Sequence, residues 1–246
     1  MMSYKVERIT PYDPDRPKQE QVTDLFNEIA PVYDKMNGIL SLGIDDYWRG
    51  EALRSIRIYQ PGHILDIATG TGDLAIQAYH VLQPKKIVAA DISTGMMEIG
   101  KEKVRAKGLQ DIISFEQQAS EAMTFPGNTF DAVISSFGVR NFQSIDQSFQ
   151  EALRVLKPGG VFLFLELTTP EQAPMKELYS IYTRHVMPML SGFFSRKQKE
   201  YAYLPNSIAA FPQGREMMLI LKKNGFRNIR LRRFTLGITT MYLAEK

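Results

Sequence analysis

Short apolar runs alternate with helically spaced segments through the middle of the chain. The apolar runs predict five strands, at 63–67, 86–90, 112–117, 130–135 and 160–166. Helical spacing of apolar residues predicts helices between them, at 73–82, 94–107 and 145–154. Runs that are apolar on both faces and separated by helices indicate a parallel sheet covered on both sides. With right-handed crossovers, this pattern predicts a doubly wound α/β fold.

The segment before the first strand follows a different pattern. Residues 1–20 are polar and contain three prolines, which predicts a flexible N-terminal arm. Residues 21–60 show helical spacing and predict a helical lid. Within this lid we expect Pro31 to divide the first helix into two pieces, because proline interrupts helical hydrogen bonding. A further helix is expected at about 47–56.

Residues 61–246 are expected to form the main domain. An insertion at about 171–223 has a mainly helical pattern and predicts a cap over the substrate. The final stretches, "FRNIRLRRF" and "GITTMYLAE", predict two strands that close the sheet as an antiparallel hairpin.

The composition is that of an ordinary globular protein, with 44% hydrophobic and 23% charged residues in 246. The absence of cysteine excludes disulfides, thiolate nucleophiles and cysteine-based zinc sites. The three histidines lack metal-ligand spacing, so we expect no metal. We also expect a cytoplasmic location, because the N-terminus lacks the apolar run of a signal peptide and no window resembles a membrane span.

The net charge of +3 is mild, but basic residues gather at 196–199 and 227–233. These clusters are either solvated faces or surfaces attracted to an anionic membrane. No motif typical of nucleic-acid binding is present.

A glycine-rich loop follows the first predicted strand. In "LDIATGTGDLA", Gly70, Gly72 and Ala75 match the pattern G-x-G-x-x-A, which lets a backbone approach a ligand closely. Asp91 ends the second predicted strand, about 20 residues beyond this loop, where a carboxylate can accept two hydrogen bonds from a ribose diol. Strand, loop, helix and carboxylate together predict a nucleotide-like cofactor.

Two cofactors fit this arrangement. A dinucleotide would place its pyrophosphate at the helix N-terminus. S-adenosylmethionine is instead cationic, and acidic residues beside the loop favour it. Asp66 and Asp73 provide such residues, so the electrostatics favour S-adenosylmethionine. Asp73 could alternatively be only a first-turn residue favoured by the helix dipole.

Three stretches carry a family resemblance. "YDKMNGILSLGIDDYWR" at 33–49, "RVLKPGGVFLFLELT" at 154–168 and "FGVRN" at 137–141 resemble the menaquinone/ubiquinone-biosynthesis C-methyltransferases over about 21–246. The resemblance implies the class I S-adenosylmethionine-dependent methyltransferase fold, which is Rossmann-like. Its seven-stranded sheet is mostly parallel and ends in an antiparallel hairpin. The implied reaction is C-methylation of a polyprenylated quinol ring, with demethylmenaquinol as the expected substrate and a ubiquinone precursor or another lipid or small molecule as the alternative.

The same resemblance assigns cofactor contacts along the strand ends. It implies that these contacts include Gly70, Thr71, Gly72, Asp91, Ala119, Ser120 and Ser136, and the electrostatic argument above adds Asp66. Within this set, Asp91 is the implied ribose ligand, and Ala119 and Ser120 flank the adenine. One departure is Asp45, which stands where the family pattern usually has a histidine. A catalytic role for that histidine therefore cannot be transferred to this chain.

Methylation of an aromatic carbon requires alignment of the two reactants, stabilisation of a ring oxyanion and removal of a proton. Arg140 and Asn141 follow the fourth predicted strand, and we expect them to act on the ring oxygen as catalytic residues. Tyr33, in the lid, is a third candidate. The alternative for Arg140 is a loop-fixing role, paired with a nearby carboxylate.

The expected partner is a polyprenyl quinol, collected through transient peripheral contact with the inner face of a membrane. The sequence leaves the oligomeric state open, a homodimer included. Two other functions fit parts of the pattern: an NAD-dependent oxidoreductase and a non-catalytic cofactor-binding protein.

Overall fold

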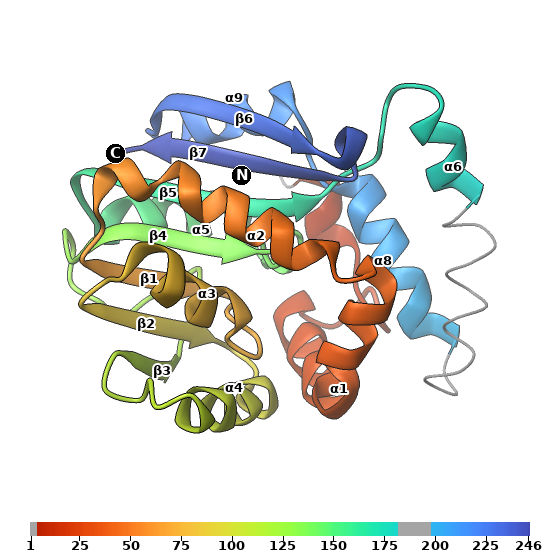
Figure 1. Cartoon of the computed structure of the whole chain (residues 1–246). Coiled ribbons are helices and arrows are strands. Elements are labelled where there is room, and N and C mark those ends of the chain that lie inside the picture. The colour runs from red at the N-terminus through yellow and green to blue at the C-terminus, as the bar shows by residue number, and fades with distance from the viewer. Residues whose placement is uncertain (1–3, 182–197) are drawn as a thin grey trace.

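The computed structural model describes residues 4–181 and 198–246, and within them seven strands form one sheet (Figure 1). The order across the sheet is β3-β2-β1-β4-β5-β7-β6. The strands are β1 (His63–Ile67), β2 (Lys86–Asp91), β3 (Ile113–Gln117), β4 (Phe130–Ser136), β5 (Leu156–Leu167), β6 (Arg227–Phe234) and β7 (Thr239–Glu245).

The first five strands are parallel, whereas β7 pairs antiparallel with both β5 and β6. This arrangement confirms the predicted mostly parallel sheet and its C-terminal hairpin. The strand order reverses between β1 and β4. In doubly wound sheets a ligand crevice opens at such a reversal, outside the carboxyl ends of the strands.

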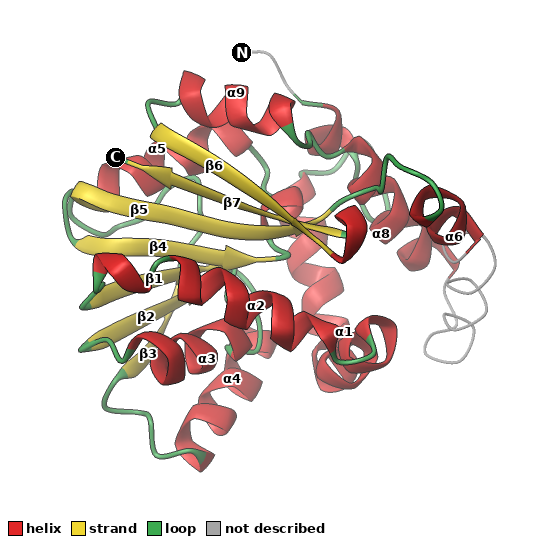
Figure 2. Cartoon of the chain, turned by 45° about the horizontal axis from the view of Figure 1, so that its top comes forward, coloured by secondary structure: helices red, strands yellow, loops and turns green. Residues whose placement is uncertain are grey.

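Helices cover both faces of the sheet and the carboxyl ends of its strands (Figures 1 and 2). They are α1 (Lys18–Ser41), α2 (Ile44–Ser55), α3 (Asp73–Leu82), α4 (Thr94–Ala106), α5 (Ile145–Val155), α6 (Met175–Ile181), α8 (Gln198–Ala210) and α9 (Arg215–Lys223). Short 3-10 turns are η1 (Lys5–Arg8), η2 (Arg57–Tyr59), η3 (Val139–Asn141) and η5 (Thr235–Gly237).

Alternating side chains of the buried strands build two hydrophobic cores. On β1, Ile64 packs with α2 and α3, whereas Leu65 and Ile67 face the core that contains α5 and α9. On β5, Phe162 and Phe164 join that second core. Because both faces of these strands are buried, their sequences read as continuous apolar runs.

Helix α1 is continuous from Lys18 to Ser41, so the predicted division at Pro31 is wrong. Pro31 lies on an exposed position of the helix, where the ring removes one backbone hydrogen bond without disturbing a packed face. Val22 and Leu25 are buried on the opposite side. Tertiary packing therefore outweighs the local disruption, and a single helix crosses the strand ends.

The first described residues, for which the sequence predicts a flexible arm, contact the body of the protein. Val6 in η1 is fully buried. Lys18 is also buried, and its Nζ donates to the carbonyl oxygens of Val6 at 2.8 Å and Arg140 at 2.7 Å. Burial lowers the pKa of Lys18 to about 7. This lysine therefore connects η1, α1 and η3.

The expected insertion at about 171–223 contains α6, α8 and α9 in its described part, while residues 182–197 lie outside it. Helices α6 and α8 lie beyond the carboxyl ends of the parallel strands (Figure 1). No described helix combines the length and apolarity needed to cross a membrane.

Candidate active site

A pocket opens at the carboxyl ends of β1, β2 and β4, beside α1. It is narrow inside, with an enclosed volume of about 70 Å³, and measures about 650 Å³ when the open space at its mouth is counted. Its lining comes from α1 and from the loops after β1, β2, β3 and β4. The predicted site residues among the lining are Tyr33, Gly70, Asp91, Ser120, Ser136 and Asn141.

The glycine loop joins β1 to α3 and is held against the end of β2. Gly70 and Gly72 both have positive φ, 56° and 78°, a conformation that favours glycine. The Gly70 N–H donates to Asp91 Oδ2 at 2.8 Å, and the Ser93 N–H donates to Asp91 Oδ1 at 2.8 Å. Burial raises the pKa of Asp91, although these hydrogen bonds oppose the shift. Each carboxylate oxygen keeps a second lone pair that can accept from a ligand.

Asp66 is a fully buried carboxylate at the end of β1. The Thr69 hydroxyl donates to its Oδ2 at 2.6 Å, and the Ala75 N–H also stabilises the carboxylate, but Oδ1 accepts no hydrogen bond of regular geometry within the described chain. Burial raises the pKa of Asp66 to about 7. A cationic ligand would favour the ionised form and supply the missing partner.

Thr71 and Asp73 face a charged cluster that joins the glycine loop to α1. Lys103 Nζ donates to Asp34 Oδ2 at 2.9 Å, to Thr71 Oγ1 at 3.1 Å, and also to Asp73 Oδ1. The Thr71 hydroxyl donates to Asp34 Oδ1 at 2.6 Å. Lys103 therefore offsets the negative charge of Asp73, and the expected attraction of a cofactor by this residue rests instead on Asp66. The cluster ties α1 to α3 and α4.

The chain makes a close turn after β4. A side chain at Gly138 would place its Cβ 2.6 Å from the Ala68 Cβ and 3.2 Å from Ser135 Oγ. Only glycine fits between the two loops, so the chain after β4 passes close to the loop after β1. Phe137 has a positive φ of 60° and lines the pocket with Ser136.

Arg140, in η3, is buried and pairs with a buried carboxylate. Its Nη1 donates to Glu166 Oε1 at 2.6 Å and also to the Phe137 carbonyl. The Arg140 N–H donates to Glu166 Oε2 at 3.1 Å. Glu166, on β5, is thus the carboxylate that a loop-fixing arginine requires. Arg140 Nε is buried and has no acceptor within the described chain, so one N–H is left for another group.

Asn141 and Tyr33 bring polar groups to the pocket from opposite sides. Asn141 Oδ1 accepts a hydrogen bond of 2.9 Å from Tyr203 Oη of α8. Burial raises the pKa of both Tyr203 and Tyr33, which keeps these phenols neutral at physiological pH. The Tyr33 ring packs edge-on against Phe26, with centroids 5.9 Å apart.

Ser120 lines the pocket from the loop after β3. Its Oγ lies 3.0 Å from Ser148 Oγ and donates to Glu121 Oε2 at 3.1 Å. Ala119 precedes it and is not a lining residue. The remaining predicted residues, Asp66, Thr71, Gly72 and Arg140, likewise adjoin the lining residues without being among them.

Sequence reasoning missed several residues that build this site. They include the partners and wall residues Lys18, Phe26, Lys103, Gln118, Glu121 and Glu166. The acidic Glu166 inside the apolar run "VFLFLEL" was the clearest available signal, because an acidic residue in a buried strand requires a partner. The lysines carried no comparable signal.

Comparison with known proteins adds independent findings. A model of the ubiE/COQ5 methyltransferase family matches residues 15–246. A demethylmenaquinone methyltransferase from Bacteroides fragilis is 46% identical over 245 residues, covering 100% of both chains. A ubiquinone/menaquinone biosynthesis C-methyltransferase from Geobacter sulfurreducens is 41% identical, covering 93% of this chain and 90% of that protein.

Solved structures share the fold at lower identity. An S-adenosylmethionine-dependent methyltransferase from Thermotoga maritima matches with a TM-score of 0.63 and 13% identity, covering 92% of this chain and 99% of that one. A phosphoethanolamine N-methyltransferase from Haemonchus contortus, solved with S-adenosylhomocysteine, matches with a TM-score of 0.54 and 18% identity. The match covers 75% of this chain and 49% of that one. These likenesses confirm the expected methyltransferase fold.

Proposed function

The chain belongs to the ubiE/COQ5 methyltransferase family, and we propose that it methylates a ring carbon of demethylmenaquinol to form menaquinol. S-Adenosylmethionine is the cofactor and, when bound, supplies the electrophilic methyl group. The observation that carries the proposal is the pocket at the strand reversal, where Asp91 faces the glycine loop, combined with full-length identity of 46% to a demethylmenaquinone methyltransferase.

The residues present fit this cofactor. Asp66 has a buried oxygen without a partner, which suits the cationic amino-acid end. Asp91 retains lone pairs for a ribose diol, and Ser120 lies on the wall expected to face the adenine. Asp91 would serve the ribose of either cofactor, but the negative charge of Asp66 beside the glycine loop would repel a pyrophosphate, so Asp66 disfavours the dinucleotide of an oxidoreductase.

The quinol ring is proposed to lie between α1 and η3, beside Tyr33, Phe137 and Asn141. A ring carbon becomes nucleophilic when the neighbouring hydroxyl loses its proton, so groups that stabilise the resulting oxyanion favour the reaction. The positive charge of Arg140 lies next to Asn141 in η3, and its buried Nε–H has no acceptor within the described chain. Glu166 fixes the guanidinium, while Tyr203 fixes the Asn141 amide. These catalytic assignments are part of the proposal.

The ring substrate is tested by direct competition. We expect methyl transfer to a short-tailed demethylmenaquinol analogue to proceed with a higher kcat/KM than transfer to the demethylated ubiquinol counterpart, because the proposed substrate is a naphthoquinol. Both reactions are measured by transfer of labelled methyl from S-adenosylmethionine. Preference for the benzoquinol would contradict the assigned ring, and transfer to neither would contradict the proposed function.

The raised pKa of Asp66 makes cofactor binding depend on pH. The pKa of Asp66 is about 7 in the free protein, so below pH 7 its carboxyl group is mostly protonated. A cationic cofactor that binds the carboxylate must then displace this proton, which weakens binding. Affinity for S-adenosylmethionine should therefore rise about tenfold per pH unit up to about pH 7 and level off above it.

Calorimetric titration between pH 5 and pH 8 measures this dependence. Asp66→Asn keeps the shape of the side chain but cannot ionise, so the variant should bind weakly at all pH values, without the rise. An identical pH dependence in the variant would contradict the role of Asp66.

A further inference from the structure

Two exposed leucines stand on neighbouring turns in an unfavourable backbone conformation. Leu42, between α1 and α2, is 83% exposed, and Leu236, in η5, is 71% exposed. Both adopt the left-handed conformation, with φ of 53° and 54°. A side chain with a Cβ is disfavoured there, and glycine or asparagine is the usual residue. Two positions thus combine backbone strain with a solvent-exposed apolar side chain, and neither feature stabilises the isolated protein.

Contacts between α2 and η5 place the two turns at one end of the molecule. Trp48 Nε1 donates to Thr235 Oγ1 at 2.8 Å, and the rings of Tyr47 and Phe234 meet edge-on with centroids 6.5 Å apart. Tyr47 is itself 55% exposed. The α1–α2 turn and η5 therefore form one surface at the carboxyl end of the sheet (Figures 1 and 2).

Helix α6 extends this apolar character at the same end of the molecule (Figure 1). Leu178 and Ile181 on this helix are both more than half exposed. The segment leading to α6 is tied to η5, because Thr168 Oγ1 donates to the Gly237 carbonyl oxygen at 2.7 Å.

The basic residues beside these turns are largely neutralised. Arg232 lies 3.2 Å from Glu51 and stacks over Phe234, while Arg233 lies 3.1 Å from Glu171. An apolar contact rimmed by arginine and aromatic side chains suits the boundary between lipid headgroups and acyl chains. Attraction by net positive charge would contribute less here than burial of the leucines.

We propose that Leu42 and Leu236 insert into the surface of a lipid bilayer and hold the carboxyl end of the sheet, where the pocket lies, against it. This inference rests on the proposed function, because a polyprenylated quinol resides in the bilayer and must reach the pocket from there. Single apolar side chains on separate turns suit a fluid lipid surface better than the flat complementary patch of a protein interface. Attraction of the basic residues at 227–233 to anionic lipid is then secondary. In the other basic cluster, residues 196 and 197 lie outside the described residues.

Flotation of the full chain with vesicles of phosphatidylcholine and phosphatidylglycerol tests the proposal. We expect the wild type to float at both low and high salt, and Leu42→Asn or Leu236→Asn to lower the vesicle-bound fraction about tenfold or more, since each removes one inserted leucine. Because asparagine tolerates the left-handed conformation, neither variant should lose thermal stability. Weakened binding would therefore not reflect unfolding.

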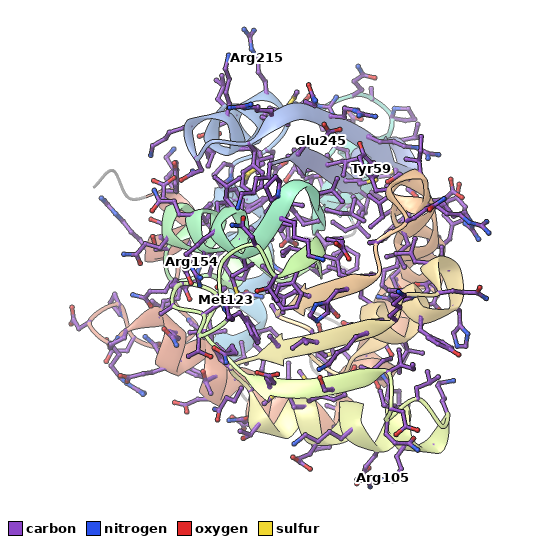
Figure 3. The ribbon with its side chains drawn as sticks, turned by 90° about the vertical axis from the view of Figure 1, so that its left-hand side faces the viewer. Tyr59, Arg105, Met123, Arg154, Arg215 and Glu245 are labelled. Atoms are coloured by element: carbon purple, nitrogen blue, oxygen red, sulfur yellow. The ribbon has the colours of Figure 1, made fainter. Side chains whose placement is uncertain are left out.

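Ile58→Asn is the matched control, because Ile58 is as exposed as Leu42, at 83%. It lies in η2, whose Tyr59 faces the viewer in Figure 3, on the side opposite α1 and α6. This variant should float like the wild type. The proposal would be overturned if the doubly substituted protein floated like the wild type, or if salt alone abolished flotation of the wild type. It would also be overturned if the substitutions changed only self-association, measured by sedimentation.

A short-tailed quinol analogue separates this inference from the proposed function. The wild type and all these variants should methylate it equally in solution, because its access needs no membrane. Failure of the wild type to methylate the analogue contradicts the function, whereas equal flotation of wild type and leucine variants contradicts only the docking surface.

Discussion

Arg140→Met is expected to lower kcat for methyl transfer by about a hundredfold to a thousandfold, the range typical for loss of one group that stabilises an oxyanion. The same substitution should lower the free energy of unfolding by about 3–5 kcal/mol, since it leaves the carboxylate of Glu166 buried without its guanidinium. Steady-state kinetics and urea unfolding measure the two effects.

The double variant Arg140→Met with Glu166→Gln separates catalysis from stability. Neutralising Glu166 removes the unpaired buried charge, so part of the lost free energy of unfolding should return. The glutamine oxygen can still accept one of the two backbone N–H groups, of Arg140 and Leu167, that Glu166 now binds. Turnover should remain low, because the positive charge near the ring oxygen is still absent.

Recovery of turnover together with stability would contradict a catalytic role for Arg140. The arginine would then act only by fixing η3 and, through it, the neighbouring Asn141. The single variant Glu166→Gln gives a further readout. If Glu166 positions the guanidinium, this variant should lower kcat more than it raises KM, and the loss should be smaller than in Arg140→Met.

Asp91→Ala is expected to raise the dissociation constant for S-adenosylhomocysteine by about a hundredfold or more. Hydrogen bonds to a charged group contribute about 1.5–3 kcal/mol each, and a ribose diol would donate two of them to this carboxylate. The substitution also frees the N–H groups of Gly70 and Ser93, so the glycine loop loses its attachment to the end of β2. Isothermal titration calorimetry measures the loss.

Asp131→Ala provides the matched control for Asp91. Asp131 also accepts two backbone N–H bonds, from Gly62 at 3.0 Å and His63 at 2.7 Å, but at the amino end of β4, away from the pocket. Its removal should lower thermal stability while leaving cofactor affinity unchanged. Equal losses of affinity in both variants would mean that general destabilisation, rather than a cofactor contact at Asp91, explains the effect.

Most of the sheet could be predicted from the sequence, because its evidence is local. Buried parallel strands such as β1 and β4 are continuous apolar runs, and the glycine loop carries its geometry in Gly70 and Gly72. Asp91 could be placed by its position at a strand end. Helix α1 shows the limit of local evidence, since Pro31 predicts a break that packing of the helix overrides.

The partners of the site residues could not be predicted, because they come from distant segments. Glu166 meets Arg140 only through the pairing of β4 with β5. Tyr203 reaches Asn141 from α8, and Lys103 joins Asp34 across α4 and α1. Nothing in the spacing of these residues along the sequence indicates that they meet. Their burial and charge show that the contacts affect stability and the site only once the fold is known.

In the proposed reaction, this pocket transfers a methyl group to a ring carbon of demethylmenaquinol. The most direct measurement incubates the full chain with S-adenosylmethionine labelled with ¹³C in its methyl group and a demethylmenaquinol, and locates the label in the product by NMR. We expect a carbon-bound methyl on the quinone ring, produced by the wild type and strongly reduced in Asp91→Ala. A methyl bound to oxygen, or no labelled quinone, would contradict it.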